Sequence, residues 1–368
     1  SGDHRNLHSF PTRRSSDLAS AMALMVEEVN LEVASAAAQA GIELHRATGE
    51  AAYAERAIEL AQVILNSQER ERKDWSLPLS GFFYTDPRRE RLVHYSHRGH
   101  EQAPVVVLAA LCDLFPNHPD WMRWYAAVVR HSEYLRAIAG VTAPYGMLPA
   151  SVYDVNESDD SQFREQVRNG IRLDDRHYLR IFPVWFELRG NSGTVLSQAK
   201  ALSAAARLRR HAELGEVLAR QLEWHMGRNP FCQSLMFGVG HDYAPQYTAM
   251  SGDLSGSLRF GVQTRANADL PYWPMSNCYN YKEVWVHPSS RWLWVQADLQ
   301  ALPPIVRANG MEVTELRART GRDGRVRIEA TVRGEGRHRL SLRTANLSVE
   351  TPEQTVELRG RRWSKVRW

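Results

Sequence analysis

The sequence predicts a mainly helical domain followed by a small antiparallel β domain. In several segments between residues 19 and 299, apolar residues recur at spacings of three and four, which is the periodicity of amphipathic helices. Residues 325–333 instead alternate strictly between apolar and charged side chains, as a strand with one buried face does. The pattern changes at Pro303-Pro304, so we divide the chain into residues 1–18, 19–300 and 301–368.

The predicted helices form hairpins, because each pair is joined by a short polar link. The pairs are 19–48 with 51–68, 102–115 with 119–138, and 194–211 with 214–226, and a last helix covers 290–299. Gly49 supplies the expected end of the first helix. We predict irregular loops at 75–98 and 141–160 and a long one at 227–277. Loops of that length inside a compact domain are usually functional.

Residues 1–18 are excluded from the fold prediction. The stretch from Ser9 to Leu18, S-F-P-T-R-R-S-S-D-L, resembles the translation of a sequencing adapter. Residue 19 then falls inside a helix, so we expect the natural protein to begin upstream. For the full-length protein we expect a secreted or periplasmic location.

The basic charge is concentrated at the C-terminal end. Residues 301–368 hold 15 basic and 8 acidic residues, a net charge of +7, whereas 19–300 hold 28 basic and 32 acidic ones, a net charge of −4. The basic residues alternate with apolar ones as solvated strand faces do, so we expect no nucleic-acid partner. No apolar run reaches the length of a membrane span, and we expect no membrane partner. The three cysteines have neither disulfide nor metal spacing.

The segment Tyr279–Trp294, Y-N-Y-K-E-V-W-V-H-P-S-S-R-W-L-W, contains the candidate catalytic residue, Glu283. Aromatic residues surround it in sequence: Trp273, Tyr279, Tyr281, Trp285, Trp292 and Trp294. Aromatic faces exclude water from a carboxyl group and raise its pKa, which suits a general acid. The same mixture of rings and polar groups suits a sugar. The alternative is a structural glutamate among core aromatics.

Two further clusters of polar residues are candidate sites. His94, His97 and His100 recur at intervals of three, but Gly99 interrupts the run, and we predict no metal and no cofactor. We expect this loop at the mouth of a cleft, with Arg98 and His100 bonding sugar hydroxyls.

Asp174 and Asp175, in R-L-D-D-R-H-Y, form the second cluster. One of them can serve as a general base, or both can pair with Arg172, Arg176 and Arg180 or cap a local turn. The sequence leaves both possibilities open.

Three segments carry a family resemblance: W-H-M-G-R-N-P-F at 224–231, S-L-M-F-G-V-G-H-D at 234–242, and Y-K-E-V-W-V-H-P at 281–288. Together with the helical hairpins, they resemble glycoside hydrolase family 9, the cellulase-type family among the six-hairpin glycosidases. The resemblance implies an (α/α)6 barrel, incomplete at its N-terminus, and an inverting hydrolase of β-linked oligo- or polysaccharides. It implies that Glu283 is the general acid. The expected substrate-binding residues are Arg98, His100, His241, Tyr243, Trp273, Tyr281 and Trp285.

The chain departs from the family pattern at three places. Gln246-Tyr247-Thr248 stands where the family has a His-x-Arg pair, and Lys282 stands where it has Asn before the glutamate. The Asp-x-Gly-Asp motif that supplies the family's base does not occur in the chain. We therefore expect the catalytic base to lie upstream of residue 19, and we expect residues 19–368 alone to be nearly inactive.

Two alternative functions stay open. Another (α/α) barrel enzyme, a polysaccharide lyase or a sugar epimerase, would use residues such as Tyr95, His97 and Arg98. A non-catalytic barrel would bind carbohydrate without turnover.

Overall fold

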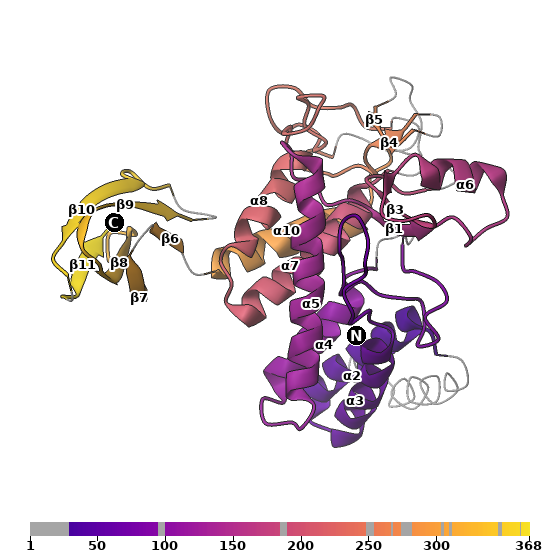
Figure 1. Cartoon of the computed structure of the whole chain (residues 1–368), viewed down its shortest axis with the longest axis horizontal. Helices are drawn as coiled ribbons and strands as arrows, with labels where there is room; N and C mark the ends of the chain where they lie inside the picture. Colours follow the sequence, from indigo (N-terminus) through magenta and orange to yellow (C-terminus); the bar gives the residue numbers. More distant parts are fainter. Residues whose placement is uncertain are drawn as a thin grey trace, which may run out of the picture.

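The computed structural model describes residues 29–94, 100–184, 190–247, 254–265, 268–273, 282–302, 305–308, 311–344, 348–360 and 362–368. Within these ranges the chain forms eight α-helices and eleven strands. The helices are α2 (Leu31–Thr48), α3 (Ala51–Asn66), α4 (Ala103–Leu114), α5 (Trp121–Ala139), α6 (Ser161–Arg168), α7 (Ser192–Arg209), α8 (Leu214–His225) and α10 (Val286–Ala301). They gather in one domain, and the last six strands form a second one (Figure 1).

The first hairpin, α2–α3, shows how local sequence sets the helix ends. The Asn30 side chain accepts a hydrogen bond from the Val33 N–H at 2.9 Å and caps α2. Gly49 ends the helix in the left-handed conformation, at φ 74°, and its N–H donates to the His45 carbonyl. Ala34 and Ala38 are fully buried. Such small side chains let α2 and α3 pack closely, as the sequence predicts.

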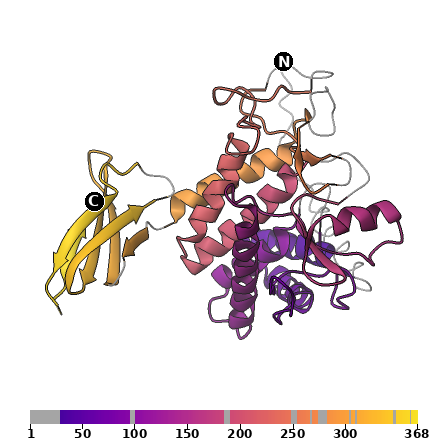
Figure 2. The same cartoon turned by 45° about the horizontal axis from the view of Figure 1, so that its top comes forward.

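Helix α7 is the centre of the helical domain. Residues on all its sides are buried, and it packs against α4, α5, α8 and α10 (Figures 1 and 2). Lys200 of α7 donates to Asp298 of α10 at 3.0 Å, and Ser203 donates to the same carboxylate at 2.6 Å. Both charged side chains are almost fully buried, so this pair ties α7 to α10.

A small sheet and the helix α6 lie between α5 and α7. Residues 151–154 of this sheet fall in the predicted loop 141–160, and residues 161–193 carry no predicted element. Strands β1 (Ser151–Asp154), β3 (His177–Arg180) and β2 (Ile171–Arg172) pair antiparallel in the order β1-β3-β2. All four residues of β1 are buried, so the strand lacks the alternation that would reveal it. Asp160 caps α6 by accepting from the N–H groups of Gln162 and Phe163.

The long loop between α8 and α10 is fastened to this sheet. Arg180, fully buried, donates to the Gln166 carbonyl at 2.6 Å and lies 3.4 Å from Asp269 of the loop. Asp269 in turn accepts from the N–H groups of Ile181 and Phe182. The loop also contains a two-stranded ladder of β4 (Gln263–Thr264) and β5 (Pro271–Tyr272).

The C-terminal β module consists of two three-stranded antiparallel sheets. One has the order β10-β9-β6 and the other β11-β8-β7. The strands are β6 (Ile305–Ala308), β7 (Glu312–Thr320), β8 (Val326–Arg333), β9 (Gly336–Arg343), β10 (Glu353–Leu358) and β11 (Ser364–Arg367). The predicted alternation is confirmed in β8, whose buried residues meet Leu340 and Leu358 of the other sheet in a common core.

The described residues thus form a mixed fold of eight helices and small antiparallel sheets, and Figure 1 shows the β module extending beyond the end of α10. The described residues do not show the closed ring of six helical hairpins that an (α/α)6 barrel requires. In the described part of the chain, no helix is both long enough and apolar enough to cross a membrane.

Candidate active site

The loop that carries the site starts at the end of α8, where Asn229 holds it in place. The Asn229 side chain is buried and donates to the carbonyls of Trp224 and Gln233 at 2.8 and 2.9 Å. Its oxygen accepts from the Phe231 N–H at 3.1 Å. The G-R-N-P segment therefore acts as a structural clasp for the loop that follows it.

Glu283 lies on a short segment that pairs with residues 258–260. The Phe260 N–H donates to the Glu283 carbonyl at 2.9 Å, and Arg259 forms a bridge with Val284. The carboxyl group of Glu283 is partly buried, and its Oε2 accepts a 2.6 Å hydrogen bond from the Trp285 indole N–H. Within the described residues, no group donates to its other oxygen, Oε1. One oxygen of the carboxyl group is thus held in place.

The start of α7 supports this segment from below. Asn191 donates its N–H to the Val262 carbonyl, and its side-chain oxygen accepts from the Val262 N–H at 3.1 Å. The approach is close, since a Cβ on Gly261 would lie 2.4 Å from Ser192 Oγ, and Gly261 has a φ of +112°. Position 261 therefore requires glycine. Through these contacts the start of α7 holds the strand segment that pairs with the Glu283 segment.

Aromatic and histidine rings lead from Glu283 towards a cavity. The Trp285 ring packs edge-on to Phe260 at 4.7 Å and tilted against His287 at 5.7 Å. The His287 ring meets His100 edge-on at 6.4 Å, and His100 lines the cavity. An electrostatic interaction also connects α10 to the cavity lining. Burial lowers the pKa of Arg291 on α10, and the carboxylate of Glu101, which lines the cavity, opposes that shift.

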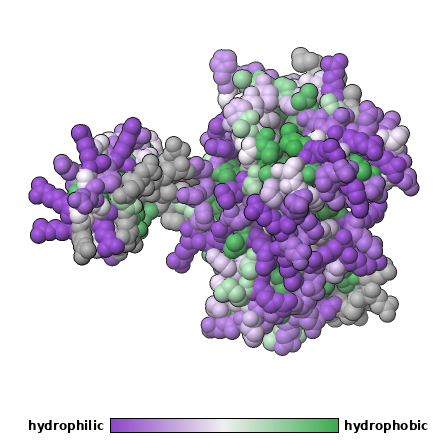
Figure 3. Space-filling model, in the orientation of Figure 1, coloured by the Kyte–Doolittle hydropathy of each residue, from purple (hydrophilic) through white to green (hydrophobic). Residues whose placement is uncertain are grey.

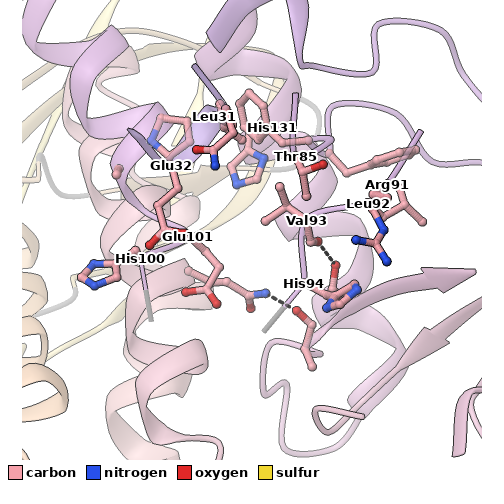
Figure 4. A pocket seen from close by; sticks show the side chains of 18 of the residues that line it. Leu31, Glu32, Thr85, Arg91, Leu92, Val93, His94, His100, Glu101 and His131 are labelled. Atoms are coloured by element: carbon pink, nitrogen blue, oxygen red, sulfur yellow. Dashed lines mark hydrogen bonds between the residues drawn. The ribbon is translucent and has the colours of Figure 1, made fainter. Parts of the chain in front are cut away.

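The cavity has a volume of about 660 Å³, within the range of small-molecule sites. Its walls combine aromatic and apolar side chains with a few polar groups: Leu31, Phe82, Phe83, Leu92, Tyr134, Leu135, Phe163, Arg91, His94, His100, Glu101, His131 and Glu157. Figure 4 shows His94 and Glu101 on opposite sides of it. Such a lining offers flat apolar faces and hydrogen-bonding groups together.

A histidine–carboxylate pair, which the sequence analysis missed, lines this cavity. His94 Nε2 lies 2.6 Å from Glu157 Oε2, and the His94 ring stacks on Tyr153 at 4.3 Å. The Leu92 N–H donates to the other Glu157 oxygen at 3.3 Å. Glu157 belongs to the acidic stretch of the loop 141–160, but its partner lies 63 residues away, so no local pattern reveals the pair.

The remaining predicted residues are distributed unevenly. Trp273 packs against an apolar cluster that includes Val262, beside the Glu283 segment. His241 and Tyr243 lie exposed on the loop, where the Tyr243 ring meets Phe237. Within the part of the chain that the structure describes, neither side chain forms a hydrogen bond with Glu283. Arg98 and Tyr281 lie outside the described residues.

Thr248 lies outside the described residues, but the backbone of Tyr247 reaches the Glu283 segment. The Tyr247 N–H donates to the Lys282 carbonyl at 3.2 Å, one residue before Glu283. The Gln246 side chain is turned inward and donates to Ser257 at 2.6 Å. Gln246 therefore serves the loop's own structure.

The acidic pair Asp174-Asp175 is engaged in local bonding. Burial alone would raise the pKa of Asp174, but hydrogen bonds from the His177 and Arg176 N–H groups and from the His177 ring lower it. Asp175 forms an ion pair with Arg172. These contacts favour ion pairing and turn capping over the role of a general base.

The described residues contain no group of three histidine, cysteine, aspartate or glutamate side chains that could hold a metal ion. His97 is outside the described part.

The sequence matches no model of a known protein family, and a search of curated proteins finds no match.

Proposed function

We propose that the chain is part of an inverting glycoside hydrolase for β-linked saccharides, in which Glu283 donates the proton to the leaving oxygen. The observation that carries the proposal is the Glu283 carboxyl group held by the Trp285 indole at 2.6 Å. It lies at the start of a series of rings, through His287 and His100, that reaches a cavity of about 660 Å³. A fixed carboxyl group that these rings connect to an aromatic and polar cavity supports acid catalysis on a sugar.

The neighbouring groups have separate roles in this proposal. The rings of Phe82 and Phe83 offer apolar faces for sugar rings, and His94 and His100 offer hydrogen bonds to hydroxyl groups. Glu157 orients the His94 ring through the 2.6 Å contact. The resemblance of the segments 224–231 and 281–288 to family 9 and the paired helices agree with a six-hairpin barrel, which we propose as the complete architecture.

The reaction needs a second carboxylate across the sugar ring. In inverting enzymes the acid and the base are about 6.5–9.5 Å apart, so that a water molecule fits between them. The base removes a proton from this water as it attacks the anomeric carbon, while the glycosidic C–O bond breaks and Glu283 protonates the leaving oxygen. We assign no base among the described residues, since Asp174 and Asp175 are held in local pairs.

The proposal is tested on a panel of soluble β-linked polysaccharides, with and without added azide. Azide carries no proton to remove, so it can attack the anomeric carbon in place of water and bypass a missing base. We expect azide-dependent cleavage that Glu283→Gln abolishes. Glu223→Gln is the matched control, because Glu223 is a half-exposed surface residue paired with Arg228.

Other outcomes separate the alternatives. Unsaturated, ultraviolet-absorbing products that persist in Glu283→Gln would identify a lyase. Saccharide binding unchanged by Glu283→Gln, without cleavage of any polysaccharide in azide, would identify a non-catalytic barrel.

A further inference from the structure

The hairpin between β7 and β8 concentrates positive charge. Residues 317–327, R-A-R-T-G-R-D-G-R-V-R, contain five arginines and a single acidic residue, Asp323. The register places Arg319 directly opposite Arg327, and like charges in that position destabilise a sheet. Arg327 is balanced by Asp323 at 3.2 Å, but in the described part of the chain Arg319 and Arg325 form no ion pair.

A groove of about 600 Å³ lies at the end of this hairpin. Arg325 lines it from the turn and Arg327 from β8. Arg367 and Trp368 line it from the neighbouring end of β11. Its polar lining also includes Asp323, Glu350 and Gln354. The β module carries a net charge of +7, and hydrophilic side chains project from its outer side (Figure 3).

The groove is built from ordered contacts. Trp368 pairs with Ile328 through two backbone hydrogen bonds of 2.8 and 2.9 Å, which fix its main chain beside the groove, and its partly buried ring packs against the core of the module. Gln354 donates to the Arg367 carbonyl at 2.8 Å, joining the two sheets. On the outer surface next to Arg367, hydrogen bonds from Lys365 and Arg367 lower the pKa of Glu329 to about 2.

We infer that this groove binds an anionic saccharide, one that carries carboxylate or sulfate groups. Guanidinium groups pair with such anions in a bidentate way, and an indole ring packs on the apolar face of a sugar. The carboxylates of Asp323 and Glu350 favour a saccharide over a nucleic acid, because each sugar of a polysaccharide offers several hydroxyl donors. These carboxylates accept hydrogen bonds from the sugar hydroxyls. The choice of a saccharide rests on the proposed function, and it narrows the substrate class to acidic polysaccharides.

The test is affinity gel electrophoresis of the whole chain in gels containing polygalacturonate, hydroxyethylcellulose or neither. The test variant is Arg325→Gln/Arg367→Gln, and the matched control is Arg337→Gln/Arg339→Gln. The control removes the same charge from β9, outside the groove. Thermal unfolding checks that both variants stay folded, and no turnover is needed, so the result is independent of the hydrolase assay.

We expect polygalacturonate, but not hydroxyethylcellulose, to retard the protein. The test variant should bind about tenfold more weakly, two exposed charge contacts being lost, while the control keeps its affinity. Three results would overturn the inference: no retardation by polygalacturonate, equal weakening in both double variants, or stronger binding to a single-stranded oligonucleotide than to polygalacturonate.

Discussion

Trp285 donates its indole N–H to Oε2 of Glu283 at 2.6 Å, and the two residues are separated by a single position in the chain. The geometry follows from the backbone: the segment runs antiparallel to residues 258–260, so Glu283 and Trp285 lie on the same side of it. The indole thereby orients the carboxyl group that the proposed reaction uses.

Replacing Trp285 by Phe keeps an aromatic ring but removes the donor. We expect kcat for azide-dependent cleavage to fall roughly tenfold to a hundredfold, as loss of a hydrogen bond to a charged group does, with little change in KM. Trp294→Phe is the control, because Trp294 is 46% exposed on α10. If both variants retain wild-type kcat, the indole does not orient the acid.

Gly261→Ala tests the support that α7 gives to the Glu283 segment. The new Cβ would meet Ser192 Oγ at 2.4 Å and Ser192 N at 2.7 Å, so we expect a loss of several kcal/mol in the free energy of unfolding. Gly256→Ala is the matched control: Gly256 also has a positive φ, +82°, but nothing lies within 4 Å of its added Cβ. That variant should lose only about 1 kcal/mol from backbone strain. Equal losses in urea unfolding would show that the close approach is unimportant.

The buried pair between α7 and α10 has a large effect on stability. Asp298→Asn leaves the Lys200 ammonium buried without its counter-charge, and we expect a loss of about 3–5 kcal/mol in urea unfolding. Burial already lowers the pKa of Lys200 to about 8, although Asp298 opposes the shift. Asp113→Asn breaks the half-exposed pair between Asp113 of α4 and Arg207, which lies on α7 as Lys200 does. This variant should lose less than about 1 kcal/mol in the free energy of unfolding. A similar, small cost for both variants would contradict the importance of the buried pair.

We expect the protein to lose stability in mild acid because His131 and His225 are buried. Burial lowers the pKa of His131 and of His225 to about 4, although each ring lies within hydrogen-bond distance of a backbone carbonyl. Below pH about 6.5 the unfolded chain takes up protons that the folded chain refuses, so stability falls as the pH drops from about 6.5 towards 4. Each histidine contributes on the order of 3 kcal/mol to this fall.

His225→Gln should flatten that part of the stability–pH curve. His241→Gln, which changes an exposed histidine, is the control and should leave the slope unchanged. Parallel curves for the wild type and His225→Gln, measured by urea unfolding at several pH values, would show that His225 does not titrate in this way.

The fold could be predicted where the pattern is local. The hairpin α2–α3 shows the helical period and ends at Gly49, and β8 alternates as a half-buried strand must. The sheet β1-β3-β2 escaped prediction, because β1 is buried on both faces and β2 has only two residues. In such strands tertiary packing, and not local periodicity, decides the conformation.

The candidate site likewise contains residues that the local sequence predicts and residues that only the tertiary structure brings together. Glu283 and Trp285 are near neighbours in sequence, so their association could be anticipated. The pair of His94 and Glu157 depends on the folding of two loops onto one cavity, and no spacing rule connects residues 63 positions apart. The exposed position of His241 is likewise a tertiary property that the motif did not reveal.

The most direct test of Glu283 as proton donor compares leaving groups in the presence of azide. Wild type and Glu283→Gln are assayed on a β-glycoside with a poor leaving group and on one with 2,4-dinitrophenolate, which departs without protonation. We predict that Glu283→Gln loses at least about a hundredfold in rate on the first substrate and little on the second, with NMR showing the α-glycosyl azide expected from inversion. Equal losses on both substrates, or retained activity on the poor leaving group, would contradict the assignment of Glu283 as the general acid.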